Sequence, residues 1–173
     1  EDFFISCNFS RETFEAEDFA QKSIEIMQEY QFPRELLIFE LTESALAHQL
    51  EQIRSNMHTL KAYGVSIILD DFGEGFTSFA DLQQYPVDGI KLDKGLVDNN
   101  QTENGIAILR AMVQVGHDLG ITILAEGVED DDQVQALCQI HCDVIQGYQF
   151  YLPMPQNEAK DKILEQFCGV GEL

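Results

Sequence analysis

The sequence predicts an α/β fold of the barrel type, in which parallel strands alternate with helices around one centre. Two observations predict it. Short apolar runs alternate with segments whose apolar residues recur every three or four positions, as expected for strands that alternate with helices. Each expected strand also ends in polar, mostly acidic residues. In a (β/α)₈ barrel the carboxyl ends of the strands form one rim, where enzymes of this fold keep their catalytic groups.

The expected strands are apolar on both faces, which is typical of a parallel sheet covered by helices. The stretch 65–69, for example, is β-branched, nearly all apolar and too short for a core helix. Six strands are expected, at residues 3–9, 36–42, 65–70, 89–92, 121–125 and 144–146.

The helices are predicted from their spacing and from the residues that end them. Ile53, Met57 and Leu60 recur at intervals of three and four, and Gly64 follows as a stop signal. A later helix is expected to begin behind Thr102 as its N-cap. Helices are expected over residues 19–30, 50–60, 106–113, 134–137 and 157–167. No G-x-G-x-x-G or P-loop sequence joins a strand to its helix, so nucleotide binding of the doubly wound kind is not expected.

Composition limits the classes of partner. The chain has 173 residues, 45% of them hydrophobic, which is enough for one sizeable core. Its 10 Lys and Arg against 31 Asp and Glu give a formal charge of −21, which argues against DNA, RNA or an anionic membrane surface as a partner. No apolar run approaches the length of a membrane span. The N-terminus has neither a basic segment nor a cleavage site, and we expect it to begin in mid-fold.

The cysteines bear on the cellular compartment. They are Cys7, Cys138, Cys142 and Cys168. A zinc site of Cys138, His141 and Cys142 is one interpretation, but the spacing fits no paired C-x-x-C arrangement. We therefore expect reduced, mostly buried thiols in a cytoplasmic protein, and a full-length protein tethered to a membrane is compatible with that.

The residues at the strand ends carry the functional prediction. They are Asn8, Glu40, Glu43, Asp70, Asp71, Lys91, Asp93, Glu126, Glu129 and Gln146. One acid or amide in such a place is ordinarily a helix N-cap or a solvated loop residue. Strands that bury both faces, however, have no local reason to end in acid each time. We therefore expect these side chains to converge at one rim.

Asp70 and Asp71 are the most informative pair. Adjacent strand residues point to opposite faces, so both reach one site only where the strand ends and the backbone turns. Two carboxylates that close repel unless a cation lies between them. Oxygen ligands without His or Cys suit Mg²⁺ or Mn²⁺, and a bridging carboxylate is typical of two-metal sites that act on phosphoesters. Lys91 would stay charged in this ring of acids and stabilise charge on phosphate.

Six segments also resemble, in order and spacing, the signatures of a known family. They read "NFS", "FELTES", "DDFGEGFTSF", "IKLD", "AEGVE" and "QGYQF" followed by Pro153. They are similar to those of EAL domains, the bacterial phosphodiesterases that hydrolyse cyclic di-GMP. The resemblance runs from about residue 8 to residue 155. It implies a modified TIM (β/α)₈ barrel, two Mg²⁺ or Mn²⁺ ions as cofactors, and cleavage of cyclic di-GMP to linear pGpG.

The resemblance implies a role for each matched residue. The implied metal ligands are Asn8, Glu40, Asp70, Asp71 and Glu126, with Asp70 bridging. The implied catalytic residues are Lys91 and Glu126, around the attacking water, and Glu43, which holds the loop after the two aspartates. Asp93, Gln146 and Pro153 are implied to lie at the substrate. Glu129 is implied to lie next to these residues without contacting the metal ions or the substrate itself.

The chain also departs from the family pattern. It has no Glu-Ala-Leu tripeptide at its start, and a full barrel needs about 250 residues. Residues 1–173 are therefore expected to be the C-terminal three quarters of one EAL-type barrel domain, with about six of its strands. Glu74 stands where the family has a small residue, Phe76 replaces a tyrosine, and Leu152 occupies a place often held by arginine.

Two alternatives to the phosphodiesterase stay open. A non-catalytic receptor for cyclic di-GMP, or a degenerate EAL domain that binds protein, would use the same barrel, but degenerate relatives usually lose acids that are present here. An enolase-like barrel would use Lys91 to abstract a proton beside Mg²⁺, whereas adjacent Asp70 and Asp71 favour two metals and phosphate. A homodimer and an upstream sensory or cyclase domain are further partners that the sequence allows.

Overall fold

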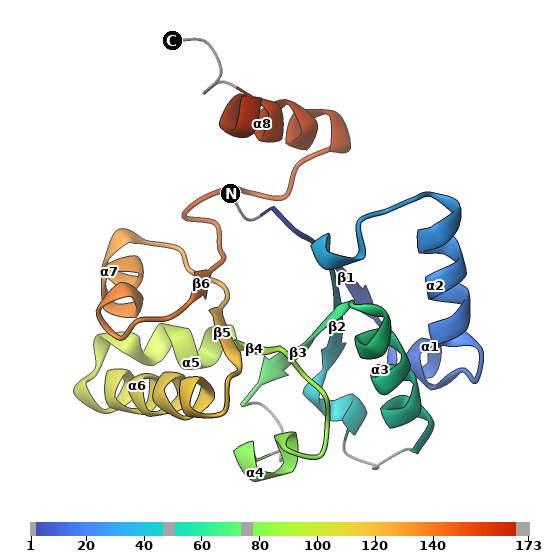
Figure 1. Ribbon diagram of the computed structural model, residues 1–173. Coiled ribbons are helices and arrows are strands. Elements are labelled where there is room, and N and C mark those ends of the chain that lie inside the picture. Colours follow the sequence, from blue (N-terminus) through green and yellow to red (C-terminus); the bar gives the residue numbers. More distant parts are fainter. Residues whose placement is uncertain (1–2, 47–50, 74–77, 169–173) are drawn as a thin grey trace.

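The centre of the molecule is one sheet of six parallel strands, in a computed structural model that describes residues 3–46, 51–73 and 78–168. The strands are β1 (Ile5–Phe9), β2 (Leu37–Thr42), β3 (Ser66–Phe72), β4 (Gly89–Leu92), β5 (Thr122–Ala125) and β6 (Val144–Ile145). Neighbours in sequence are neighbours in the sheet, and the sheet curls into a half-barrel (Figure 1). The predicted parallel barrel fold is confirmed, with β1 and β6 as the two edges of the sheet.

Helices cover the two halves of the sheet (Figure 1). Beside the first strands lie α1 (Arg11–Glu15), α2 (Phe19–Glu29) and α3 (Glu51–Tyr63). Beside the later strands lie α5 (Lys94–Asp98), α6 (Glu103–Asp118) and α7 (Asp131–Gln139). The short helix α4 (Phe79–Leu82) follows β3, and α8 (Gln156–Cys168) ends the chain. Three 3₁₀ turns, η1 (Arg34–Leu36), η2 (Glu43–Leu46) and η3 (Asn99–Gln101), complete the described elements.

Most of these elements follow from the sequence pattern. Thr102 is the N-cap of α6, and its Oγ1 accepts a hydrogen bond from Gly105 N at 2.9 Å. Gly120 follows α6 with φ +71°, a conformation that glycine adopts without strain. Periodicity does not reveal α1, α4 or α5, because four or five residues are too few to show a repeat.

A cluster of phenylalanines fills the space between the first strands and their helices. The ring centroids of Phe9 and Phe39, on β1 and β2, are 4.5 Å apart. Those of Phe14 and Phe19, on α1 and α2, are 4.7 Å apart, and Phe14 is fully buried. Aromatic rings at these separations gain dispersion and quadrupole energy in addition to burial. This packing holds the first two strands against α1 and α2.

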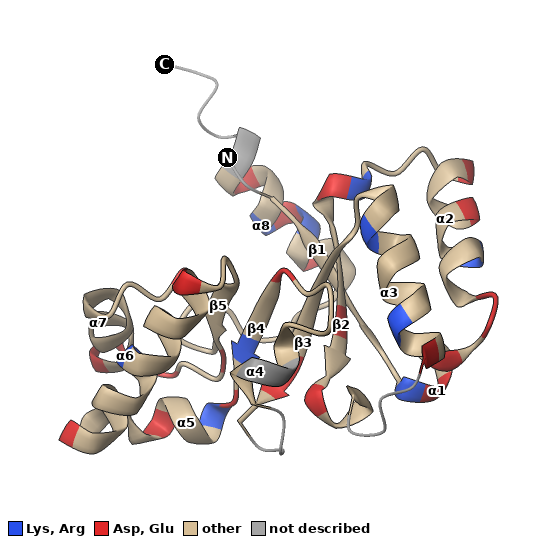
Figure 2. Cartoon of the chain, turned by 60° about the horizontal axis from the view of Figure 1, so that its bottom comes forward, with Lys and Arg blue, Asp and Glu red and all other residues tan. Residues whose placement is uncertain are grey.

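Charged side chains are spread over the surface. Acidic residues occur on helices at both sides of the sheet and at strand ends, with few Lys and Arg among them (Figure 2). None of the described helices is both long and apolar enough to cross a membrane.

The carboxyl end of β3 differs from the prediction. The strand continues to Phe72 instead of ending at Asp70, and its pairing with β4 shifts register between Leu69 and Phe72. Asp71 lies in this irregularity with φ +55°, a left-handed conformation that aspartate tolerates better than most residues. A bulge of this kind disturbs the strict alternation of side chains. Two adjacent aspartates can therefore approach one site while the strand continues.

Two aspartates anchor the amino ends of the sheet in the same way. Asp88, ahead of β4, accepts a hydrogen bond from Ile67 N at 2.8 Å and pairs with Lys61 near the end of α3. Asp143, ahead of β6, accepts from Ile123 N at 2.8 Å and lies 3.0 Å from Nε2 of His117 near the end of α6. Each aspartate thus ties a strand to the helix that precedes it.

We expect Asp143→Ala to lower the free energy of unfolding by about 1–3 kcal/mol, because the buried N–H of Ile123 loses its acceptor. Urea unfolding followed by circular dichroism measures the change. Asp161→Ala, on the exposed surface of α8, is the matched control and should change stability by less than about 0.5 kcal/mol. Equal effects of the two substitutions would contradict the anchoring role of Asp143.

Candidate active site

The ammonium group of Lys91, on β4, lies among three carboxylates from neighbouring strands. Its Nζ is 2.9 Å from Asp70 Oδ1, 3.1 Å from Glu40 Oε2 and 3.1 Å from Glu126 Oε2. The side chains of Lys91 and Glu40 are only 6% and 5% exposed, so these ion pairs lie largely out of water. Strands β2 and β3, with the residue that follows β5, supply the three acids. Four of the predicted site residues therefore meet at the carboxyl end of the sheet.

The carboxylates of the site outnumber its one ammonium group, and the pKa values of Lys91, Glu126 and Asp71 are all raised. Burial alone would lower the pKa of Lys91, but its hydrogen bond to Asp70 and the charges of Glu40 and Asp70 outweigh burial and raise it. Burial raises the pKa of Glu126, and the negative charges of Asp70 and Asp71 raise it further. The hydrogen bond and the charge of Lys91 lower this pKa but do not cancel the rise. Burial and the charge of Asp70 also raise the pKa of Asp71. The site therefore holds excess negative charge that a further cation would neutralise.

Asn8, on β1, completes the first edge of the site. It lies opposite Glu40 in the pairing of β1 with β2. With its amide nitrogen turned toward the acids, Asn8 donates to Glu40 Oε2 at 3.2 Å and to Asp70 Oδ2 at 3.3 Å. With its amide oxygen turned the same way, oxygens of Asn8, Glu40 and Asp70 converge, which is a donor set that suits a hard cation.

A second group of oxygens lies on the other side of Asp70. Asp70, Asp71 and Glu126 each offer a carboxylate oxygen, and these oxygens lie within 4.8 Å of one another. Among the side chains that the structure describes, no other set of three His, Cys, Asp or Glu residues meets this condition. The donor chemistry fits Mg²⁺ or Mn²⁺, because all the ligand atoms are oxygens.

Among the described side chains, Cys138, His141 and Cys142 do not bring their ligand atoms within 4.8 Å of one another, so the structure does not support a zinc site there. Cys142 donates weakly to the carbonyl oxygens of Val144 at 3.4 Å and Ile123 at 3.5 Å, and burial raises its pKa to about 11. Cys7, Cys138 and Cys142 are free thiols. The prediction of mostly buried thiols is wrong, because Cys138 on α7 is exposed and Cys7 and Cys142 are only partly buried. The side chain of Cys168 lies outside the described residues.

Glu43 holds the backbone that follows the two aspartates. Its side chain is buried, with 2% of the residue exposed, and Oε2 accepts a hydrogen bond from Gly73 N at 3.0 Å. Gly73 has φ +108°, and a Cβ there would lie 2.5 Å from Cδ1 of Leu96. A side chain at this position would therefore meet both strain and a clash. Glu74 and Phe76, further along the same loop, lie outside the described residues.

The remaining predicted residues have partners other than Lys91. Asp93 is the N-cap of α5, and its Oδ1 accepts from Gly95 N at 2.7 Å. Gln146, Pro153 and Glu129 line an adjoining pocket of about 520 Å³, which is also lined by Lys94, Gly127, Tyr148, Tyr151 and Leu152. Glu129 forms an ion pair with Lys94, at 2.8 Å.

Sequence reasoning missed Lys94 and Gln133. Lys94 borders the pocket, and Gln133 is a buried residue of α7 with 5% exposure. Nothing in the pattern separates them from ordinary solvated helix residues. Their roles depend on contacts between α5, α7 and the segment after β5, which are far apart in sequence.

The fold and the site together define a parallel α/β-barrel protein with an acidic site at the carboxyl ends of its strands, where barrel enzymes carry their chemistry. The chain matches the EAL domain family over residues 1–153, and it belongs to that family.

Relatives and solved structures agree with this assignment. The chain is 33% identical over 137 residues to the cyclic di-GMP phosphodiesterase RocR of Pseudomonas aeruginosa, covering 79% of this chain and 35% of RocR. The structure titled PaMucR phosphodiesterase, c-di-GMP complex, superposes with a TM-score of 0.84 at 30% identity, over 91% of this chain and 64% of that one. The EAL domain of Mycobacterium smegmatis DcpA gives 0.88 at 27% identity, over 94% and 73%. The chain spans about a fifth of the length of several curated relatives that it matches.

We expect Lys91→Met to lower the free energy of unfolding in EDTA by about 3–5 kcal/mol, because three largely buried carboxylates lose their shared cation. Urea unfolding at neutral pH measures this. Lys162→Met removes an exposed lysine, 2.9 Å from Glu165 on α8, and should change stability by less than about 1 kcal/mol. If both substitutions cost the same, Lys91 does not hold the acids together.

Proposed function

We propose that this chain belongs to a cyclic di-GMP phosphodiesterase that cleaves one phosphodiester, with two Mg²⁺ or Mn²⁺ ions, to give linear pGpG. The observation that carries the proposal is the convergence of Glu40, Asp70, Asp71 and Glu126 around Lys91 at the barrel rim. Membership of the EAL family, the similarity to the cyclic di-GMP phosphodiesterase RocR and the likeness to the c-di-GMP complex of PaMucR support cyclic di-GMP as the substrate.

The metal ions would be held by oxygen ligands that are already gathered. Asn8, Glu40 and Asp70 would hold one ion, and Asp70, Asp71 and Glu126 the other, so that Asp70 bridges. Metal ions held by these residues would supply polarisation of phosphoryl oxygens and would lower the pKa of a bound water.

The protein's own residues would position and stabilise the reacting groups. Lys91, kept protonated by the surrounding acids, keeps Glu40, Asp70 and Glu126 in place, and its charge stabilises negative charge on phosphate. Glu126, whose carboxylate lies 3.1 Å from Lys91 Nζ and beside Asp70 and Asp71, would accept a proton from the attacking water. Glu43 keeps the backbone at Gly73 in position beside Asp71. Asp93, Gln146 and Pro153 would orient the rest of the substrate.

The enolase-like alternative is disfavoured by the surroundings of Lys91. A lysine that abstracts a proton has to be neutral near working pH, which requires a lowered pKa. Three carboxylates within 3.1 Å of Nζ have the opposite effect. Lys91 is therefore better suited to electrostatic stabilisation than to proton abstraction.

We also propose that residues 1–173 are the C-terminal three quarters of one EAL-type barrel. The chain aligns over 94% of its own length but 73% of the DcpA EAL domain, and within the described residues β1 and β6 each have a neighbouring strand on one side only. Size-exclusion chromatography of this chain and of the complete gene product tests the proposal. A monomeric, cooperatively folded 173-residue chain that matches the complete product in turnover would contradict it.

We expect the complete gene product to convert cyclic di-GMP to pGpG with Mg²⁺ or Mn²⁺, and Asp70→Asn to abolish turnover because it weakens the bridging ligand. Nucleotide chromatography follows the product, and Asp161→Asn on α8 serves as the control with unchanged turnover. Turnover in excess EDTA would contradict metal dependence. Binding of cyclic di-GMP without hydrolysis would instead favour the receptor.

We expect Glu43→Ala to lower turnover about 10–100-fold and to weaken activation by Mn²⁺, because the loop after Asp71 loses the acceptor for Gly73 N. Mn²⁺ titration of initial rates measures both effects. Glu43→Gln keeps an acceptor oxygen and should retain more activity than Glu43→Ala. Full activity of Glu43→Ala at every metal concentration, with only a small loss of stability, would reduce Glu43 to a residue at the start of a helical turn.

A further inference from the structure

The segment Gly127–Glu129, which directly follows Glu126, is held by α5 through the side chain of Lys94. The Nζ of Lys94 is 2.8 Å from Glu129 Oε1, 3.4 Å from the carbonyl oxygen of Gly127 and 3.6 Å from Asp98 Oδ1. One ammonium group therefore contacts both ends of the segment and α5 itself.

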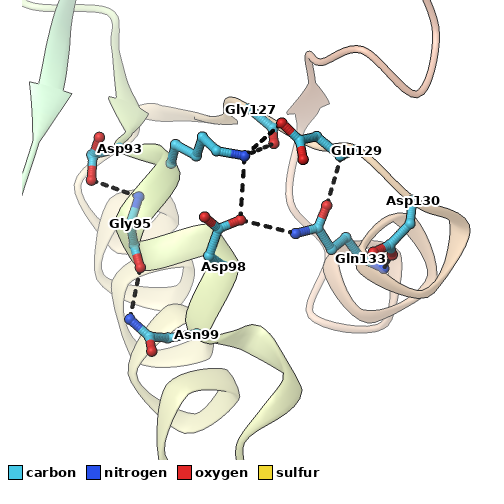
Figure 3. Close-up of polar contacts among 9 residues, drawn as sticks. Asp93, Gly95, Asp98, Asn99, Gly127, Glu129, Asp130 and Gln133 are labelled. Atoms are coloured by element: carbon cyan, nitrogen blue, oxygen red, sulfur yellow. Dashed lines mark hydrogen bonds and ion pairs between the residues drawn. The ribbon is translucent and has the colours of Figure 1, made fainter.

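Gln133, on α7, holds the same segment from the other helix. Its Oε1 accepts a hydrogen bond from Glu129 N at 2.7 Å, and its Nε2 donates to Asp98 Oδ1 at 3.2 Å (Figure 3). Both polar atoms of this buried side chain are thus used, one on the segment and one on α5. Lys94 and Gln133 meet at the carboxylate of Asp98, and we call Lys94, Asp98 and Gln133 the α5–α7 clamp.

The backbone of the segment lies directly against the stem of Lys94. Gly127 has φ +68°, and a Cβ built there would lie 2.6 Å from Cγ of Lys94. Only glycine allows the backbone and the lysine stem to approach so closely. Lys94 therefore restricts the position of the Gly127 backbone through its stem and also pairs with the charge of Glu129 through its ammonium group.

The clamped segment connects two parts of the site. On one side, Glu126 donates its N–H to Leu92 O at 3.3 Å, and its carboxylate reaches Lys91 at 3.1 Å. On the other side, Val128 N donates to the carbonyl oxygen of Gln146 at 3.1 Å. A shift of residues 127–129 would therefore move the Glu126 carboxylate and the backbone of Gln146 together.

We propose that Lys94 and Gln133 are positioning residues, which hold Gly127–Glu129 against α5 so that the Glu126 carboxylate stays beside Lys91. The inference rests on the proposed phosphodiesterase, whose attacking water Glu126 serves. Lys94, Asp98 and Glu129 are 42%, 48% and 54% exposed, and ion pairs so exposed contribute little to global stability. The α5–α7 clamp therefore restricts the motion of residues 127–129 and adds little to the free energy of unfolding of the whole protein.

Hydrogen exchange tests the clamp without reference to catalysis. Amide exchange of a peptide spanning residues 126–135 would be followed by mass spectrometry in the complete gene product, for the wild type, Lys94→Met and Lys94→Arg. We expect Lys94→Met to raise exchange in this peptide about 10-fold, with the urea midpoint unchanged, and Lys94→Arg to restore protection. Gln133→Met, which removes both hydrogen bonds, should raise exchange in the same peptide. Lys162→Met, which removes an exposed charge from α8, should leave exchange in this peptide unchanged. Unchanged exchange in Lys94→Met overturns the proposal.

Kinetics then separate positioning from substrate contact. In Mn²⁺ we expect Lys94→Met to lower kcat for cyclic di-GMP about 10-fold with KM nearly unchanged, and Lys94→Arg to recover most of kcat. A raised KM with unchanged kcat and exchange would make Lys94 a substrate contact and overturn its positioning role. If the wild type does not hydrolyse cyclic di-GMP, the proposed function fails, while exchange still decides whether the clamp exists. If the wild type is active and Lys94→Met keeps full kcat, the positioning role fails and the proposed function stands.

Discussion

The rest of the structure depends on one ammonium group, that of Lys91, which bonds to three carboxylates from three different parts of the sheet. A lysine with 6% side-chain exposure needs such partners, because an unpaired charge out of water is strongly unfavourable. The partners come from β2, β3 and the residue after β5, so only the correct order and register of the strands brings them together. A slip of one residue in β4 would turn Lys91 to the opposite face and leave the acids without their cation. The ion pairs thus couple the register of the sheet to the integrity of the site.

Backbone conformation at the end of β3 serves the same site. The left-handed conformation of Asp71 is uncommon for a residue with a side chain, and strained positions of this kind cluster where function requires them. It allows Asp70 and Asp71 to present oxygens to a common point. The hydrogen bond from Gly73 N to the buried Glu43 then fixes the chain two residues later. The bulge and the buried acceptor therefore act together on the geometry of the two aspartates.

The charge of the molecule and the charge of the site act in different directions on an anionic substrate. A formal charge of −21 repels anions at long range, although salt screens this repulsion beyond about 10 Å. The field near the site is set by nearer groups, namely Lys91 inside the rim and Lys94 at the adjoining pocket. Divalent cations held by the surplus oxygens would reverse the sign of the local field, as bound ions generally do. Binding of a phosphodiester would therefore depend on metal ions more strongly than in a basic protein.

The sequence by itself determined the order of the elements, the parallel sheet and most of the residues at the rim. It could do so because the spacing of apolar residues and the polar residues at strand ends are local features, which can be recognised without knowing the tertiary structure. The spacing of Ile53, Met57 and Leu60 was sufficient for α3, and the acids Glu40, Asp70 and Glu126 were evident as polar ends of apolar strands. Only the tertiary structure decided that β3 continues through a bulge at Asp71, that Glu43 accepts from Gly73, and that Asp93 caps α5. It also decided the roles of Lys94 and Gln133, since each depends on a contact between helices that no local pattern encodes. The physical reason is that periodicity reports which face of an element is buried, whereas hydrogen bonds and ion pairs between elements depend on distances that exist only after the elements have packed.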